Sequence, residues 1–216
     1  MDDDAQPDEP ASDRPSQRRT VVLLAVLVEG GLILLAWLLG GLLGQPPLRT
    51  FSWDYRDALW GLAGTLPMVL LFLLMLRGPV GPLRRIRQFS EEVLRPLLAP
   101  CTVIDLLGIS VLAGLGEEML FRGVLQGYFG QWSGPWVGLA LASVLFGLMH
   151  CITFTYAVLA ALMGAYLGLV WHWTGNLLPP ALMHALYDFL VLLYLMRGPG
   201  SAEAPAPDEE GPPAGA

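Results

Sequence analysis

Three clusters of ionisable side chains interrupt otherwise apolar stretches in the second half of this sequence. In chain order they are Glu117-Glu118 with Arg122, then His150, then His184 with Asp188. Carboxylates and imidazoles are the groups with which proteins move protons and bind metal ions. A charged side chain in the middle of a membrane helix costs about 2.5–3.5 kcal/mol on the insertion scale, so ionisable residues kept there are usually functional. The clusters therefore predict acid–base or metal chemistry within an apolar setting.

The first cluster divides into an ion pair and a free carboxylate. On an α-helix, with about 100° per residue, Glu118 and Arg122 lie roughly 40° apart and can pair, whereas Glu117 lies roughly 140° from Arg122. The pair predicts a supporting role for Glu118 and Arg122 and leaves Glu117 available as a base. The structural alternative is a buried ion pair with an accidental neighbour. Gly114 and Gly116 predict close helix contacts beside the carboxylates.

The two histidine clusters carry different weight. His184 and Asp188 share one helix face, so Asp188 can accept a hydrogen bond from the His184 ring and fix its tautomer. His150 alone is a weaker signal, because a single histidine on an apolar helix often only packs. Counted from the predicted outer turns at 1.5 Å per residue, Glu117, His150 and His184 lie at depths compatible with one shared site inside the membrane.

Apolar helices must position these side chains. Of 216 residues, 54% are hydrophobic and 14% are charged, against roughly 25% charged residues in soluble domains. A bilayer span needs about 20 mostly apolar residues, so we expect an all-α, polytopic transmembrane helical bundle of about six spans in the cell membrane. The predicted spans are 21–44, 58–76, 102–130, 136–152, 155–172 and 178–196.

The remaining segments predict tails, orientation and surroundings. Residues 1–20 and 197–216 are rich in acids, proline and alanine and predict disordered tails around a helical domain at 21–196. The net charge of −7 lies mainly in these tails and indicates neither an acidic nor a basic partner. The expected partners are the lipid bilayer and a peptide or membrane-protein substrate, and no nucleic acid. Arginines before the first span and within 77–100 place both termini in the cytoplasm if there are six spans. Residues 84–98 are patterned either as an amphipathic interfacial helix or as an ordinary basic loop.

Three further polar residues stand apart from the clusters. His172, between Trp171 and Trp173, predicts an aromatic belt at a membrane interface. Asp105 is expected near the cytoplasmic surface, and Glu29 is an isolated acid expected to face the bundle.

The order of the motifs, EExxxR, then FxxxH, then HxxxD, resembles the CPBP family of intramembrane proteases, also called the Abi or type II CAAX prenyl endopeptidase family. The resemblance covers about residues 95–195, including the run TGNLLP at 174–179. It implies a helical bundle with a site open to a cavity in the membrane. It further implies that Glu117 and His150 activate a water, and that His184 with residue 188 stabilises the oxyanion.

Position 188 departs from the family pattern. The family often has Asn there, which donates a hydrogen bond as it stands, whereas an ionised Asp188 only accepts. We therefore expect Asp188 to orient His184, which would then donate to the oxyanion.

Several functions fit these observations. The first is hydrolysis of a peptide bond in a peptide or membrane-protein substrate, preferably without a metal; a zinc variant would use Glu117, His150 and His184 as ligands. The second is a non-catalytic immunity or scaffold protein that binds a peptide or a membrane protein. A proton-coupled transporter is disfavoured, because no internal repeat is present. The sequence does not indicate the substrate, and no feature indicates a prenyl-binding site.

Overall fold

The computed structural model describes residues 14–77 and 81–197, and all regular secondary structure in that part is helical, as predicted. The elements are α1 (Arg14–Leu43), α2 (Tyr55–Arg77), α3 (Gly81–Phe89), the π-helical segment η1 (Ser90–Leu94), α4 (Arg95–Leu98), α5 (Val103–Glu118), the π-helical segment η2 (Met119–Gln126), α6 (Gly127–Ser133), α7 (Pro135–Met149), α8 (Phe154–Thr174) and α9 (Leu178–Arg197).

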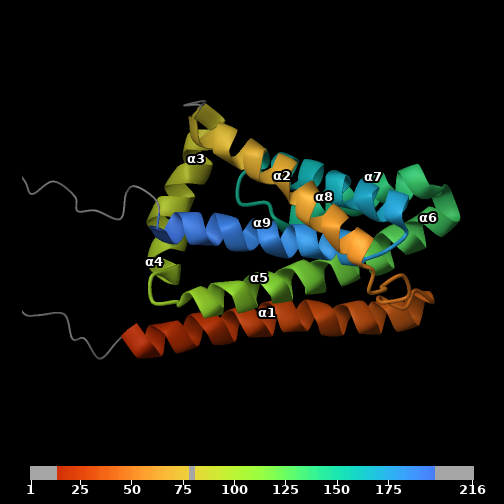
Figure 1. Cartoon of the computed structure of the whole chain (residues 1–216), viewed down its shortest axis with the longest axis horizontal. Helices are drawn as coiled ribbons and strands as arrows, with labels where there is room; N and C mark the ends of the chain where they lie inside the picture. The colour runs from red at the N-terminus through yellow and green to blue at the C-terminus, as the bar shows by residue number, and fades with distance from the viewer. Residues whose placement is uncertain (1–13, 78–80, 198–216) are drawn as a thin grey trace, which may run out of the picture.

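Most helices run along one long axis (Figure 1). The α5 helix packs against α1 and α9, α9 also packs against α2, and α7 packs against α8. The segment α3–η1–α4 lies across the end of the bundle at which α1 begins and α9 ends (Figure 1). The stretches Leu83–Leu98 and Val103–Ser133 are bent by 116° relative to one another. The amphipathic segment is therefore helical and transverse, not an irregular basic loop.

The helices account for a multi-pass membrane protein with approximately the expected number of spans. In the described part of the chain, α1, α2, α8 and α9 are long and apolar enough to cross a membrane, and the bent stretch can be counted as a fifth span. The α7 helix is apolar but has only 15 residues, about 22 Å at 1.5 Å per residue. It is too short to cross a hydrocarbon core of about 30 Å. The predicted span at 136–152 is therefore a shorter helix, ended by a turn at His150.

The first helix corrects one predicted boundary. Because α1 begins at Arg14, residues 14–20 are helical and do not belong to a disordered tail. Arg18 fixes this extension by donating two hydrogen bonds to Asp105, at 2.6 and 2.9 Å. Asp105 also accepts from the backbone N–H of Thr102, whose side chain caps α5. The rest of the predicted tails, residues 1–13 and 198–216, lies outside the described residues.

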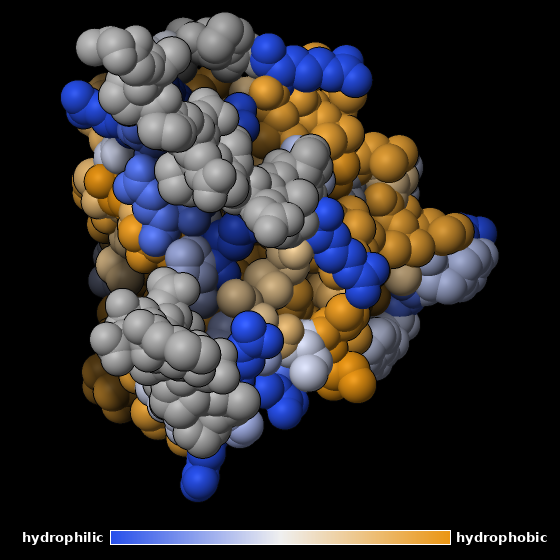
Figure 2. Space-filling view, turned by 90° about the vertical axis from the view of Figure 1, so that its left-hand side faces the viewer, coloured by the Kyte–Doolittle hydropathy of each residue, from blue (hydrophilic) through white to orange (hydrophobic). Residues whose placement is uncertain are grey.

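The two ends of the bundle carry different side chains. The end where α1 begins and α9 ends gathers hydrophilic side chains, with hydrophobic ones along the flank (Figure 2). Its arginines come from α1, α2, α3 and α9 and include Arg14, Arg18, Arg19, Arg77, Arg84, Arg85, Arg87 and Arg197. Exposed tryptophans occupy the loops and helix ends of the opposite end: Trp53, Trp60, Trp132, Trp136 and Trp173. His172 belongs to this group, with its ring centroid 5.2 Å from that of Trp136. An interfacial belt remains the interpretation of these aromatic side chains.

The largest apolar cluster surrounds η2, and it fixes the helix that carries the carboxylates. Its buried members are Ala36, Met119, Leu120, Phe121, Val124, Phe146, Ala160 and Leu177. The predicted helix at 102–130 is continuous, but it becomes π-helical immediately after Glu118. Short π-helical segments within α-helices occur frequently at functional sites. Here the π-helical segment η2 begins directly after Glu118 and contains Arg122.

Candidate active site

Small residues bring the charged helices together. A Cβ added to Gly114 would lie 2.6 Å from the backbone nitrogen of Ala185, the residue after His184. A Cβ added to Gly116 would lie 2.9 Å from the backbone oxygen of Glu29. Both distances are too short for a real side chain, so the glycines allow α5 to approach α9 and α1 beside the carboxylates, as predicted.

A buried ion cluster, which comprises Glu118, Arg122 and His184, forms one half of the site. Arg122 Nη1 donates to Glu118 Oε1 at 2.8 Å, as the helical spacing predicts. Its Nη2 donates to the carbonyl oxygen of Gly164 on α8 at 2.7 Å. The guanidinium also lies 4.7 Å from the ring centroid of Phe146. Arg122 thus compensates the Glu118 charge and joins η2 to α7 and α8.

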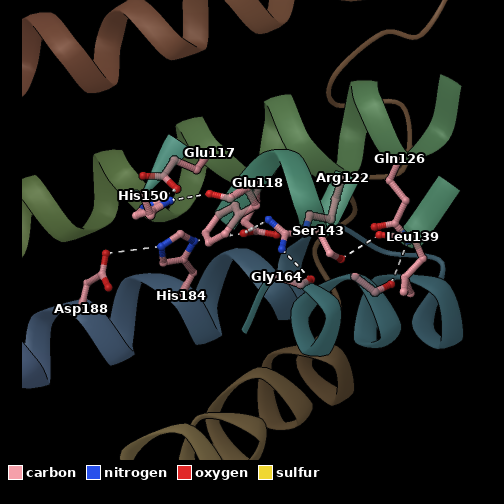
Figure 3. A network of polar contacts seen from close by, with 12 residues as sticks. Glu117, Glu118, Arg122, Gln126, Leu139, Ser143, His150, Gly164, His184 and Asp188 are labelled. Carbon is pink, nitrogen blue, oxygen red and sulfur yellow. Dashed lines mark hydrogen bonds and ion pairs between the residues drawn. The ribbon is translucent and has the colours of Figure 1, made fainter. Parts of the chain in front are cut away.

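His184 lies between two carboxylates (Figure 3). Its Nδ1 is 3.0 Å from Glu118 Oε1, and its Nε2 is 3.4 Å from Asp188 Oδ2. The contact with Asp188 agrees with the i, i+4 spacing. The shorter contact with Glu118 joins α9 to α5, and no spacing within one helix predicts it.

A second half of the site, the open pair, comprises Glu117 and His150. Glu117 Oε2 lies 3.6 Å from His150 Nε2, and the side chains are 10% and 26% exposed. Glu117 Oε2 is buried and has no hydrogen-bond partner among the described residues. Glu117 is therefore not paired with Arg122, as the helix geometry predicts.

The hydrogen bonding of His150 decides which atom faces Glu117. His150 Nδ1 is 2.8 Å from the carbonyl oxygen of Phe146, and a carbonyl only accepts, so we assign the ring proton to Nδ1. The ring also stacks on Phe146, with centroids 4.5 Å apart. Neutral His150 then presents the Nε2 lone pair to Glu117. Two acceptors that face each other in this way suit a donor, such as a water, placed between them.

His150 owes its position to the turn that joins α7 to α8. It is the first residue after α7, with φ −98° and ψ 18°. The α8 helix starts four residues later, where Thr153 accepts a hydrogen bond from the backbone N–H of Tyr156. Irregular backbone within a membrane protein is tolerated where it is buried in protein or lines a cavity. In the turn at 150–153, Cys151 and Ile152 are exposed, whereas His150 is only partly exposed and its ring faces Glu117. The turn thus holds a candidate site residue.

Two residues near the site were not assigned to it from the sequence. Glu29 on α1 has a buried Oε2 without a partner among the described residues, and it interacts electrostatically with Glu117 and His184. The sequence did mark Glu29 as an isolated acid within an apolar span. The prediction that it faces the bundle is consistent with its buried Oε2. The ring centroid of Tyr156 lies 6.3 Å from that of His150. No sequence pattern distinguished this tyrosine.

The zinc-ligand set considered from the sequence does not form. In the described part of the chain, no group of three or more His, Cys, Asp or Glu side chains is arranged to hold a metal ion. Glu117 and His150 face each other, but the ring nitrogens of His184 face Glu118 and Asp188 instead. As arranged among the described residues, these side chains do not fit a three-ligand zinc site.

Comparisons with known proteins bear on the segment that holds all three clusters. Residues 99–190 match the family model described as Type II CAAX prenyl endopeptidase Rce1-like. A curated relative, Uncharacterized protein YpbD of Bacillus subtilis (strain 168), is 35% identical over 86 residues, which cover 37% of this chain and 40% of that protein. The match thus spans less than half of that relative. No solved structure matches the chain.

Proposed function

We propose, from the match of residues 99–190 to the type II CAAX prenyl endopeptidase family model, that the chain is an intramembrane endopeptidase for a peptide or membrane-associated substrate. The observation that carries the proposal is the open pair. An unpaired carboxylate oxygen of Glu117 faces the lone-pair nitrogen of His150 at 3.6 Å. A carboxylate and an imidazole in this arrangement form a general base for water.

The reaction follows from the two acceptors. A water between Glu117 and His150 donates one hydrogen bond to each, and Glu117 takes a proton as the water oxygen attacks the carbonyl carbon. The carbonyl π electrons move to oxygen and form a tetrahedral oxyanion. When it collapses, the C–N bond breaks and Glu117 returns the proton to the leaving nitrogen. Positioned proton transfer of this kind typically contributes about 10²–10⁴-fold to a rate.

The other predicted residues take supporting roles in this proposal. Arg122 and Glu118 hold His184 in place through the buried ion cluster. Asp188 accepts from His184 Nε2 across 3.4 Å, a long contact that leaves the N–H free to turn toward an oxyanion. The metal-free mechanism is part of the proposal, and metal analysis of the purified protein with a chelator assay tests it.

Replacement of Glu117 by Gln in the cells that carry this protein tests the proposed activity. Glu117→Gln keeps the size of the side chain but cannot accept the proton. Mass spectrometry of new protein termini in the membrane fraction should detect fragments with the wild type that disappear with Glu117→Gln. The exposed acid Glu92, at the arginine-rich end, provides the control variant Glu92→Gln, which should leave these fragments unchanged.

Identical termini with and without Glu117 would refute the protease. A biological effect that persists in Glu117→Gln would then favour the alternative, a non-catalytic immunity or scaffold protein that binds a membrane partner.

The arginine-rich end faces the cytoplasm in this proposal. Helix starts and ends that carry arginine lie together at that end, and short basic flanks are retained on the cytoplasmic side during insertion. A fluorescent reporter fused after Ala216 should therefore fold and fluoresce, whereas a phosphatase fused there, which is active only outside the cytoplasm, should be inactive.

A further inference from the structure

The side chains of the site offer few hydrogen-bond donors to an oxyanion. Ionised carboxylates only accept, and the N–H of His150 is committed to the carbonyl of Phe146. His184 Nδ1 faces Glu118, and its Nε2 is shared with Asp188. Oxyanion holes gain their effect from preorganised donors directed at the developing charge. At most one shared N–H from the predicted residues is available for this role.

Tyr156 lies where a further donor is needed. Its ring is T-shaped to that of His150, with the planes at 64°. The carboxylates of Asp188 and Glu117 both act electrostatically on its phenol group, and its ring contact with His150 places the tyrosine beside the open pair. The hydroxyl forms no hydrogen bond with another described residue.

The start of α8 holds Tyr156 in this position. The backbone N–H of Tyr156 donates to Thr153 Oγ1 at 3.1 Å, which ties the first turn of α8 to the turn that carries His150. Tyr156 and His150 are therefore parts of one short segment, residues 150–156. The first turn of a helix also carries partial positive charge, which favours a negative oxygen on the same side.

We propose that the Tyr156 hydroxyl donates a hydrogen bond to the oxyanion of the tetrahedral intermediate, and that it supplies the donor that Asp188 cannot. The inference rests on the proposed protease activity and extends it. The phenol keeps its proton throughout: the negative charge forms on the former carbonyl oxygen, the hydrogen bond strengthens, and the charge returns to the C=O bond as the C–N bond breaks.

A neighbouring phenol offers a matched control. Tyr187 on α9 interacts electrostatically with Asp188 and Tyr156, and its ring packs edge-on to Phe72 at 6.5 Å. It is close to the same residues but is not part of the His150 segment. Replacement of either tyrosine by Phe removes one hydroxyl and keeps the ring.

The test uses the full-length purified protein in phospholipid vesicles and a synthetic peptide that spans the Glu117-dependent cleavage site. Removal of one oxyanion donor lowers kcat by about 10²–10³-fold in a well-studied protease, so Tyr156→Phe should lower kcat by about 10²-fold with KM nearly unchanged. Tyr187→Phe should keep the wild-type kcat. A phosphinate version of the peptide, which mimics the tetrahedral state, should bind Tyr156→Phe more weakly by the factor lost in kcat/KM.

The outcomes separate the two proposals. If no cleavage depends on Glu117, the protease and the oxyanion donor both fail. If cleavage depends on Glu117 but Tyr156→Phe keeps the wild-type kcat, only the role of Tyr156 fails. If Tyr156→Phe lowers the melting temperature and raises KM while phosphinate affinity stays at the wild-type value, the tyrosine is structural and the inference is overturned.

Discussion

The buried ion cluster and the open pair contain neighbouring residues of one type in opposite circumstances. Glu118 is fully buried and contacts Arg122 and His184 at 2.8 and 3.0 Å. Glu117, one position earlier, is 8% exposed, and its ion-pair partner among the described residues is His150, at 3.6 Å. Two carboxylates on one helix thus lie in different surroundings, because an arginine and a histidine both contact Glu118 Oε1, whereas Glu117 faces a single, more distant histidine.

In the proposed mechanism, this difference explains how a bundle in lipid can keep Glu117 as a base. An unpaired charge away from water is strongly destabilising, so most such groups are paired. The arginine, the histidine and the packed rings around Glu118 compensate the charge at that position. They also fix η2 and α9, and with them the backbone that holds Glu117. The buried ion cluster thus stabilises the backbone arrangement on which the open pair depends.

Loss of Arg122 should destabilise the protein more than any other change considered in this comparison. Arg122→Ala removes the cation and leaves Glu118 buried beside one histidine. Removal of one partner of a buried pair is destabilising by about 3–5 kcal/mol. We expect aggregation or a strongly lowered melting temperature in detergent, measured by thermal unfolding and size-exclusion chromatography.

The double variant Glu118→Gln with Arg122→Met is the control, because it removes both charges and keeps similar volumes. It should unfold at a higher temperature than Arg122→Ala. If Arg122→Ala alone unfolds like the wild type, the buried cluster does not support the fold as described.

Asp188 should show an intermediate effect. Asp188 is 30% exposed, and an amide oxygen can accept the same hydrogen bond from His184 Nε2 that a carboxylate accepts. We expect Asp188→Asn to keep kcat within about tenfold of the wild type, because the amide keeps the hydrogen bond and loses only the part due to the carboxylate charge, a difference of about 1 kcal/mol. Asp188→Ala should lose more, because the ring is no longer oriented. Equal rates for the two variants would show that Asp188 does not orient His184.

The Arg18–Asp105 pair should show the smallest effect. It resembles the Arg122–Glu118 pair in chemistry and distance, but Arg18 is half exposed at the end of the bundle. Exposed ion pairs contribute little, and salt screens them. Arg18→Ala should therefore leave the melting temperature and the cleavage rate nearly unchanged. A loss as large as that of Arg122→Ala would mean that burial does not separate the two pairs.

The contacts that follow from one helix were predictable from the sequence. The Glu118–Arg122 pair and the His184–Asp188 contact depend only on the i, i+4 spacing and are present. The apolar helices and the close approach at Gly114 were also predictable, because lipid restricts the backbone to few solutions. The catalytic roles of these residues remain predictions.

Contacts between helices were not predictable in the same way. The Glu118–His184 bond depends on how closely α5 approaches α9, and Tyr156 reaches the site only because α7 ends at Met149. The π-helical segment η2 also has no sequence mark, since it is built from residues that equally suit an α-helix. These features arise from tertiary packing, which local spacing does not encode.

The location of Glu118 and Arg122 on one helix has a consequence for biosynthesis. A membrane protein is made and inserted from its N-terminus onward, so the helix with both residues enters the bilayer before α8 and α9 exist. Its main charges can already be matched within the segment, and the contacts to Gly164 and His184 complete the match later. Glu117 has no such early partner, and its charge is left for a proton or the insertion machinery to neutralise until His150 arrives. The order of synthesis thus favours an ion pair within the helix over one made between helices.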